Sequence, residues 1–467
     1  MFASGACAAT LYGQSADALI NKLVQKGVLT EKEGKELLAE GAQTNSPATP
    51  SKFKISDAIK SMNLYGDLRL RYEYRSADNA KGTGVSGSDY VRERFRYALR
   101  LGIRGDLADD FYYGLRVETS TNPRSPWNTF ADDSNPTPSD KTKDGVNIGQ
   151  VYLGWKPEEW FEMTVGRMPM PLYVTPMIWD SDINPEGAFE KFKWSLPHAD
   201  LFASFGQFIY QDSNPDTAFP SSDTFLLAWQ IGAEVALAKD VKLKVAPVLY
   251  NYTGVGQRGA ASPSSLSTTF VGEGNAGIND TTTAGGRYNQ AGINDLTILE
   301  IPAEINFKLG GYGARVFGDF AYNFDGANRA EAAYRVTQSS GTPLDRAYKN
   351  DTKAYMFGVG YGNLGLVYGQ TSKKNTWEAR AYFQHVEQYA ADVNLLDSDF
   401  FEGRGNVQGV FAALAYSFTD NVIGTFRYGY AERINNHLGT GGSNNDLPGL
   451  NPINNYHLFQ FDLTLRF

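Results

Sequence analysis

Cysteine and histidine are scarce in this chain of 467 residues, which contains one cysteine and four histidines. A disulfide within the chain is therefore excluded, and the histidines are too scattered to indicate a zinc site. No apolar run reaches the roughly 18 residues of a helical membrane span. A net charge of −9 disfavours nucleic acid as a partner, because the phosphate backbone attracts basic surfaces.

Catalytic motifs are missing as well. The sequence has no Gly-x-Ser-x-Gly segment, which carries the nucleophile of many serine hydrolases. Neither His385 nor His457 falls on the polar face of its predicted strand, where a Ser-His-Asp site inside a barrel would need it. We therefore expect neither an enzyme nor a bound cofactor.

The sequence does show a regular alternation of apolar and polar side chains. Between Tyr456 and Phe467 it places Phe459, Phe461 and Leu463 on one face of a strand, and Gln460, Asp462 and Arg466 on the other. Glycine is abundant at 48 residues, and 13% of residues are aromatic. A transmembrane β-barrel fits this composition, because only every second residue of its strands faces lipid.

The alternation recurs in about sixteen segments of the length that a tilted strand needs to cross a bilayer. They are 62–75, 91–105, 111–120, 146–156, 160–169, 186–196, 199–211, 224–238, 241–253, 296–309, 313–325, 353–370, 375–387, 407–418, 422–434 and 456–467. Short and long connections alternate between them, and the long ones include 121–145, 254–295, 326–352 and 435–455. Pro247 and Pro302 lack a ladder donor and mark bulges. The pattern predicts an all-β fold: an antiparallel transmembrane barrel with tight turns at one end.

The two faces of these segments differ consistently. Within 224–238, Trp229 and Ile231 point one way, whereas Gln230 and Glu234 point the other. Charged groups in a solid core would each cost several kcal/mol without partners, so repeated charges on one face indicate a water-filled lumen.

Arginines are densest in the first three predicted strands, all on the polar face. They are Arg69, Arg71, Arg75, Arg92, Arg94, Arg96, Arg100, Arg104 and Arg116. Asp67, Glu73 and Glu118 share that face and would partly neutralise them. Two interpretations stay open and are compatible: a basic wall that guides solutes, or a structural lattice of arginines held by these carboxylates.

The connection between the fifth and sixth strands, 169–185, is apolar in its middle and acidic at its end. An exposed loop would not carry Val174, Met177, Ile178 and Trp179 together, so we expect this segment to pack against the barrel interior.

Two phrases here carry a family resemblance. Gly166-Arg167-Met168-Pro169, followed by the run from Trp179 to Gly187, resembles the putative porin family of Gram-negative bacteria, and the segment 17–30 is similar to that family's leader. The aromatic end of the chain also resembles the closing strand of outer-membrane barrels, so Phe467 is expected to be recognised by the barrel assembly machinery.

The resemblance implies a sixteen-stranded channel, a homotrimer in outer-membrane lipid, that passes small hydrophilic solutes and ions. It also implies that the third external loop folds inward, which places Asp180, Asp182 and Glu186 at the constriction. The basic wall opposite comprises Arg69, Arg71, Arg94, Arg96, Arg100 and Arg116. A field across the pore between these groups would orient polar solutes.

Asp180-x-Asp182-x-Asn184 has the opening spacing of a calcium loop. Pro185 replaces the required glycine, however, and Lys191 stands where the bidentate glutamate belongs, so calcium is a weak candidate.

The region before the barrel divides into three parts. Residues 1–14 are expected to be a signal remnant or disordered, which suggests a truncated or misassigned start, with Cys7 either part of the residual signal or an inert thiol. Residues 15–41 have helical periodicity and a Thr30-x-x-Glu33 capping box, which predicts a short periplasmic helical segment. A linker, 42–60, leads to the barrel, 61–467.

Three functions remain possible from the sequence. The first is a passive porin for small hydrophilic solutes. The second is a substrate-specific channel in which the arginines select phosphate or another anion. The third is a structural or adhesive barrel, whose long loops bind external partners.

Overall fold

A computed structural model describes residues 25–26, 30, 56–79, 89–120, 125–131, 144–211, 224–253, 296–330, 350–436, 438, 440 and 453–467. The chain divides into two units, Met1–Ala58 and Ile59–Phe467, and every strand belongs to the second. Nearly all of the predicted helical segment and linker, with Cys7, lies outside the described residues. No helix in the described ranges is both long and apolar enough to cross a membrane.

Within the described residues, nineteen strands form one antiparallel sheet. They are β1 (Asn63–Asn79), β2 (Asp89–Asp106), β3 (Phe111–Thr119), β4 (Asn128–Thr129), β5 (Val146–Glu158), β6 (Phe161–Arg167), β7 (Glu186–Leu196), β8 (Ala199–Gln211), β9 (Thr224–Ala238), β10 (Val241–Val245), β11 (Val248–Thr253), β12 (Thr297–Glu300), β13 (Ala303–Leu309), β14 (Tyr312–Asn323), β15 (Lys353–Gly362), β16 (Trp377–Val386), β17 (Val407–Ser417), β18 (Val422–Arg433) and β19 (Ile453–Arg466). A 3-10 turn, η3 (Phe401–Gly403), precedes β17.

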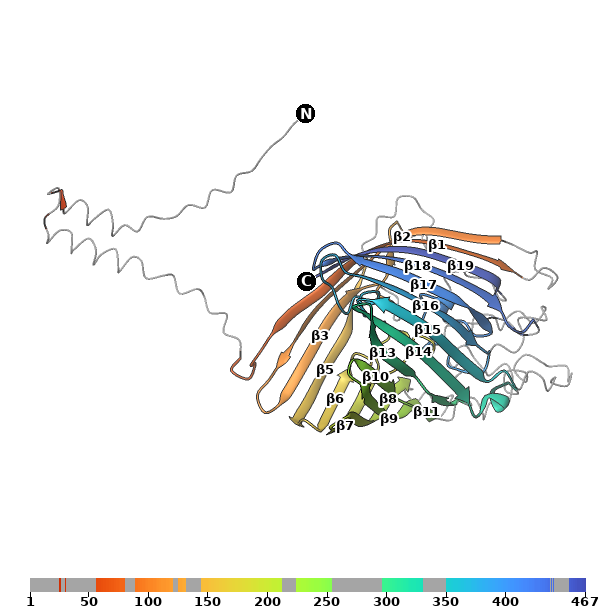
Figure 1. The fold of residues 1–467 in the computed structure, drawn as a ribbon, viewed down its shortest axis with the longest axis horizontal. Helices are drawn as coiled ribbons and strands as arrows, with labels where there is room; N and C mark the ends of the chain where they lie inside the picture. Colours follow the sequence, from red (N-terminus) through yellow and green to blue (C-terminus); the bar gives the residue numbers. More distant parts are fainter. Residues whose placement is uncertain are drawn as a thin grey trace, which may run out of the picture. The chain divides into compact units, whose positions relative to one another are not determined.

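The sheet closes on itself, because β19 pairs with β1 from Asp67 to Asn79. The other strands follow the chain order around the wall (Figure 1), except that β10 and β11 both pair with β9, β12 and β13 both pair with β14, and β3 pairs directly with β5. When β10 with β11 and β12 with β13 are each counted once, and the short β4 beside β2 is left out, the barrel has sixteen strands, which confirms the predicted fold class. Phe467 extends the closure, since its N–H and C=O both bond Gly66.

Both prolines interrupt a barrel strand, as predicted. β10 ends two residues before Pro247, and β13 begins directly after Pro302. The carbonyls of the two prolines still accept bonds, from Ile231 N at 3.1 Å and from Ala246 N at 3.1 Å. The missing donors therefore open the ladder only locally.

One strand boundary was predicted wrongly. The segment 353–370 is not one strand, because β15 ends at Gly362, where φ is +118° and a Cβ would meet the carbonyl oxygen of Trp377 at 2.3 Å. The chain then turns through 363–371, and Leu366 and Val367 are buried.

Aromatic side chains gather where the short turns are. Trp160 lies in the β5–β6 turn and stacks on Phe192, which stacks in turn on Trp194, with ring centroids 6.1 and 6.3 Å apart. Trp160 is 52% and Trp194 is 49% exposed. Exposed aromatic rings at the rim of an apolar outer surface are typical of barrels that end at a membrane interface.

Candidate functional site in the barrel lumen

The segment 168–185, between β6 and β7, crosses to other parts of the wall. Tyr173 and Gln230 of β9 exchange two hydrogen bonds, of 3.0 and 2.8 Å. Thr175 donates its N–H to Glu300 of β12 at 3.3 Å, and its hydroxyl bonds Asp319 of β14. Leu172, Met177, Ile178 and Trp179 are buried. The segment therefore packs against buried polar side chains of β9, β12 and β14.

Two glycines mark where this segment leaves and rejoins the wall. Gly166 and Gly187 lie opposite each other in the β6–β7 ladder, with φ of +121° and +144°. A Cβ at Gly187 would lie 2.2 Å from the carbonyl oxygen of Gln207. Gly166 and Gly187, which belong to the two motifs that resemble the family, are therefore required by their backbone conformation and by the close approach of neighbouring backbone atoms.

A second inward segment, 387–406 between β16 and β17, was not predicted. The hydroxyl of Tyr210 on β8 donates to Asp392 at 2.6 Å, and Arg75 of β1 binds Glu402 at 3.0 Å. Apolar side chains of the segment are buried throughout, among them Tyr389, Val393, Leu396, Phe400 and Phe401. Such apolar residues in a connection, Leu395-Leu396 and Phe400-Phe401, are the sequence signal that would have indicated an inward segment.

The two segments meet through a repeated tripeptide, Asp180-Ser181-Asp182 and Asp397-Ser398-Asp399. Asp180 donates its N–H to the carbonyl of Leu395 at 2.6 Å, and Asp397 donates its N–H to the carbonyl of Pro176 at 3.2 Å. Within each tripeptide, the first aspartate accepts a bond of 2.9 Å from the N–H of the second. The two turns are thus alike locally and hydrogen-bonded to each other.

Burial and mutual repulsion shift the acidity of these four aspartates in different directions. Burial and the neighbouring Asp182 raise the pKa of Asp180 to about 7. Burial also raises the pKa of Asp182, and burial with the nearby Asp180 and Asp399 raises the pKa of Asp397 well above its usual value. Asp399 differs, because Arg71 lowers its pKa despite burial.

Part of the arginine wall is a buried lattice. The Arg71 guanidinium holds Asp462 of β19 through two bonds, of 2.7 and 2.9 Å, and reaches Asp399 at 2.7 Å. Its carbon lies 3.9 Å from the ring centroid of Trp127. Glu73 accepts from Arg94 at 2.6 Å and also pairs with Arg75 and, more loosely, with Arg96. Arg71 and Glu73 are fully buried.

The remaining arginines of the wall are more accessible. Asp67 accepts from both Arg69, at 2.6 Å, and Arg100, at 2.9 Å. The side chain of Arg69 is 23% exposed. Arg116 pairs with Glu118 at 2.9 Å. Asp67, Glu73 and Glu118 therefore do neutralise neighbouring arginines.

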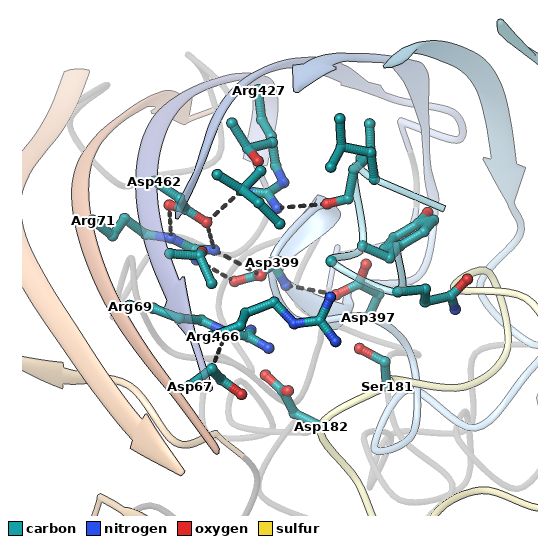
Figure 2. A pocket seen from close by; sticks show the side chains of 18 of the residues that line it. Asp67, Arg69, Arg71, Ser181, Asp182, Asp397, Asp399, Arg427, Asp462 and Arg466 are labelled. Carbon is teal, nitrogen blue, oxygen red and sulfur yellow. Dashed lines mark hydrogen bonds and ion pairs between the residues drawn. The ribbon is translucent and has the colours of Figure 1, made fainter. Parts of the chain in front are cut away.

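A cavity of about 320 Å³ lies between this wall and the inward segments. Figure 2 shows Arg69 and Arg71 of β1 on one side and Ser181, Asp182 and Asp397 on the other. Charged side chains of both signs line it: Asp67, Arg69, Arg71, Arg100, Asp180, Asp182, Asp397, Asp399, Arg427, Asp462 and Arg466. Five arginines and six aspartates thus face one small space.

The predicted site residues divide between this cavity and other places. Asp180 and Asp182 line it, whereas Glu186, at the start of β7, pairs with Arg167 and is half-exposed. Arg94, Arg96 and Arg116 are not among the residues that line it. Sequence reasoning missed Asp397, Asp399, Arg427 and Arg466. Among the described residues no group of three acidic, histidine or cysteine side chains is arranged to hold a metal ion, and the Asp180 carboxylate is bound by Ser398 instead.

Comparison with protein-family models decides the family. The model described as putative porin matches residues 85–467, more than three quarters of the chain. The chain belongs to the putative porin family. The family and the sixteen-stranded barrel indicate a bacterial outer-membrane channel protein, and both are typical of channels rather than of enzymes.

Solved structures with similar folds are porins. An OmpF of Salmonella typhi in complex with daunomycin has 10% sequence identity and a TM-score of 0.46, and the match covers 88% of this chain and 98% of that one. An anion-selective porin from Comamonas acidovorans has 10% identity and a TM-score of 0.41, with 87% and 99% covered. A mutant porin of Rh. blastica has 10% identity and a TM-score of 0.39, with 87% and 100% covered. The comparison with curated proteins gives no match.

Proposed function

We propose that this barrel is a passive diffusion channel for small hydrophilic solutes and ions, narrowed from inside by the segments 168–185 and 387–406. One observation carries the proposal: both segments bond inward-facing side chains of distant strands, and a cavity lined by charged side chains remains beside them. Water and ions occupy such a lining at low cost, whereas apolar solutes would have to displace that water.

The arginine wall gives less support to a channel specific for phosphate or another anion. Arg71 is bound by two aspartates, and Arg94 by Glu73, so much of the positive charge is already compensated. A selective anion site needs donors that a solute can reach without displacing a carboxylate. We therefore favour a channel of mixed lining over an anion-specific one.

Single-channel recording tests the proposal. The purified, refolded protein is placed in a planar lipid bilayer under a KCl gradient, and conductance and reversal potential are measured. We expect ohmic steps with weak ion selectivity. Folded protein that conducts no ions would overturn the proposal and favour a structural barrel, and anion-selective steps blocked by phosphate would favour the specific channel.

A shortened variant tests the narrowing separately. Replacing 389–400 by a short Gly-Ser linker removes side chains that are buried inside the barrel and leaves all barrel strands intact. The proposal predicts a severalfold larger conductance, and an unchanged conductance would show that this segment does not limit the path. A homotrimer, which the family resemblance implies, belongs to the same proposal and is tested by the mass of the detergent-solubilised protein.

A further inference from the structure

Two opposite charges face the cavity without binding each other. Arg466, at the end of β19, and Asp397, in the segment 387–406, both line it. The Arg466 side chain extends toward Ser181, Asp182 and Asp397 in Figure 2. In the part of the chain that the structure describes, the Arg466 guanidinium forms neither an ion pair nor a side-chain hydrogen bond.

Most other charged side chains of the cavity are compensated by a partner of opposite charge, and the Asp180 carboxylate accepts two hydrogen bonds from Ser398. Arg71 and Arg427 share Asp462, while Arg69 and Arg100 share Asp67. Asp399 is bound by Arg71, and Asp182 lies 3.6 Å from Arg100. Among the described residues, Arg466 is therefore the base of the cavity that no acidic side chain binds.

Asp397 is a complementary case, a carboxylate of the cavity that no basic side chain of the described residues binds. Its carboxylate accepts the N–H of Asp399 at 2.9 Å, and the charged groups that most affect it are the carboxylates of Asp180, Asp399 and Asp182. Burial and these neighbours raise its pKa well above the usual value. A cation held beside it would favour the ionised carboxylate by direct attraction.

We propose that this cavity is a binding site for small zwitterions, molecules of amino-acid size that carry one carboxylate and one ammonium group. The carboxylate of the solute binds Arg466, and its ammonium binds Asp397. The inference rests on the proposed channel function and names the class of solute that this channel holds during passage.

The size and the mixed charge of the site both favour this class. A volume of about 320 Å³ is at the lower end of the roughly 300–1,000 Å³ of small-molecule sites, which suits a small solute. A solute with one charge would bind one of the two groups and leave the other without a partner of opposite charge. A zwitterion satisfies both.

Matched solutes test the proposal on reconstituted channels. Butyrate, butylammonium and 4-aminobutyrate share a four-carbon skeleton and differ in the charged groups at its ends. We expect 4-aminobutyrate to reduce the KCl current saturably, at a concentration at least tenfold lower than either singly charged solute. Equal block by 4-aminobutyrate and butyrate would overturn the proposal and indicate an anion site, and no saturable block by any of them would overturn it outright.

Two single variants assign the charges. Arg466→Gln should weaken the block by 4-aminobutyrate at least tenfold and leave butylammonium as the better blocker, because only the acid remains. Asp397→Asn should weaken it equally and leave butyrate as the better blocker. Lys242→Gln and Asp240→Asn, at an exposed strand end and an exposed turn, are matched controls. The three solutes should block these two variants as they block the unaltered protein. If the Arg466 and Asp397 variants conduct normally and 4-aminobutyrate still blocks them at the lowest concentration of the three solutes, the assignment is overturned.

The proposed function and this inference fail separately. If folded protein does not conduct at all, the channel function fails. If it conducts but does not distinguish 4-aminobutyrate from butyrate, only the zwitterion site fails.

Discussion

Ser398 donates two hydrogen bonds to the same carboxylate oxygen of Asp180, one from its N–H at 3.0 Å and one from its hydroxyl at 2.8 Å. The two residues are 218 positions apart and belong to the two segments that fold into the barrel. Their contact joins the segments 168–185 and 387–406, which the proposed function places at the narrowing of the channel.

The first prediction concerns the pH dependence of this contact. Because the pKa of Asp180 is raised to about 7, the folded arrangement favours its protonated form. The stabilisation is fully present in acid and is lost as pH rises through about 7, when ionised Asp180 repels Asp182 and Asp397. We expect current fluctuations to increase between pH 5.5 and pH 8. Asp180→Asn, which cannot ionise, should flatten this dependence, and an unchanged dependence in that variant would contradict the assignment.

The second prediction concerns the Ser398 hydroxyl. Ser398→Ala removes one of the two bonds to Asp180 and leaves the N–H bond. The loss should weaken the contact of the segments by about 1–2 kcal/mol, the usual range for one bond to a buried carboxyl group. Hydrogen exchange of 168–185 and 387–406 measures this directly. Ser181→Ala, in the corresponding position of the other tripeptide, is the control. Equal exchange in both variants would show that the Ser398 hydroxyl does not stabilise the contact between the segments.

The sequence predicts the strands of the barrel wall better than it predicts the segments inside the barrel. Strand positions follow from alternation, because lipid on one side and water on the other act on each residue locally. The neutralisation of Arg69 and Arg94 was also foreseeable, since Asp67 and Glu73 lie on the same strand or its neighbour. Even the Arg71–Asp462 pair follows once the barrel closes, because the two residues lie opposite each other across β1 and β19.

The interior could not be predicted in the same way. Whether a connection folds inward depends on partners far away in the chain, such as Tyr210 for Asp392 and Arg75 for Glu402. The segment 169–185 was recognised because its apolar residues are consecutive and its phrases resemble a family. The segment 387–406 has similar apolar residues, but acidic and small residues separate them. Its inward position was therefore not predicted.

The third prediction separates the two roles of the arginine wall. Arg71→Gln would remove the guanidinium that binds Asp399 and leave Asp462 with Arg427 alone, and breaking a buried pair costs about 3–5 kcal/mol. Arg69→Gln should cost less than about 1 kcal/mol, because Asp67 keeps Arg100 and the pair is partly exposed. Urea unfolding in lipid vesicles measures both. Arg69→Gln should instead shift the reversal potential toward cations. Equal destabilisation by the two substitutions would contradict this division.

The fourth prediction concerns the glycines that frame the segment 168–185. Gly187→Ala places a methyl group 2.2 Å from the carbonyl oxygen of Gln207, in addition to the strain of a φ of +144°. Strain of this kind costs about 1–3 kcal/mol, and the clash with backbone atoms adds to it, because neither strand can move without opening the ladder. Gly311→Ala is the matched control, since φ there is +86° but no atom lies within 4 Å of the added methyl group. We expect the folded fraction, seen as heat-modifiable migration in detergent gels, to fall sharply for Gly187→Ala and only slightly for Gly311→Ala. If both fall equally, backbone strain alone explains the requirement for glycine, and the close approach of β7 to β8 does not contribute.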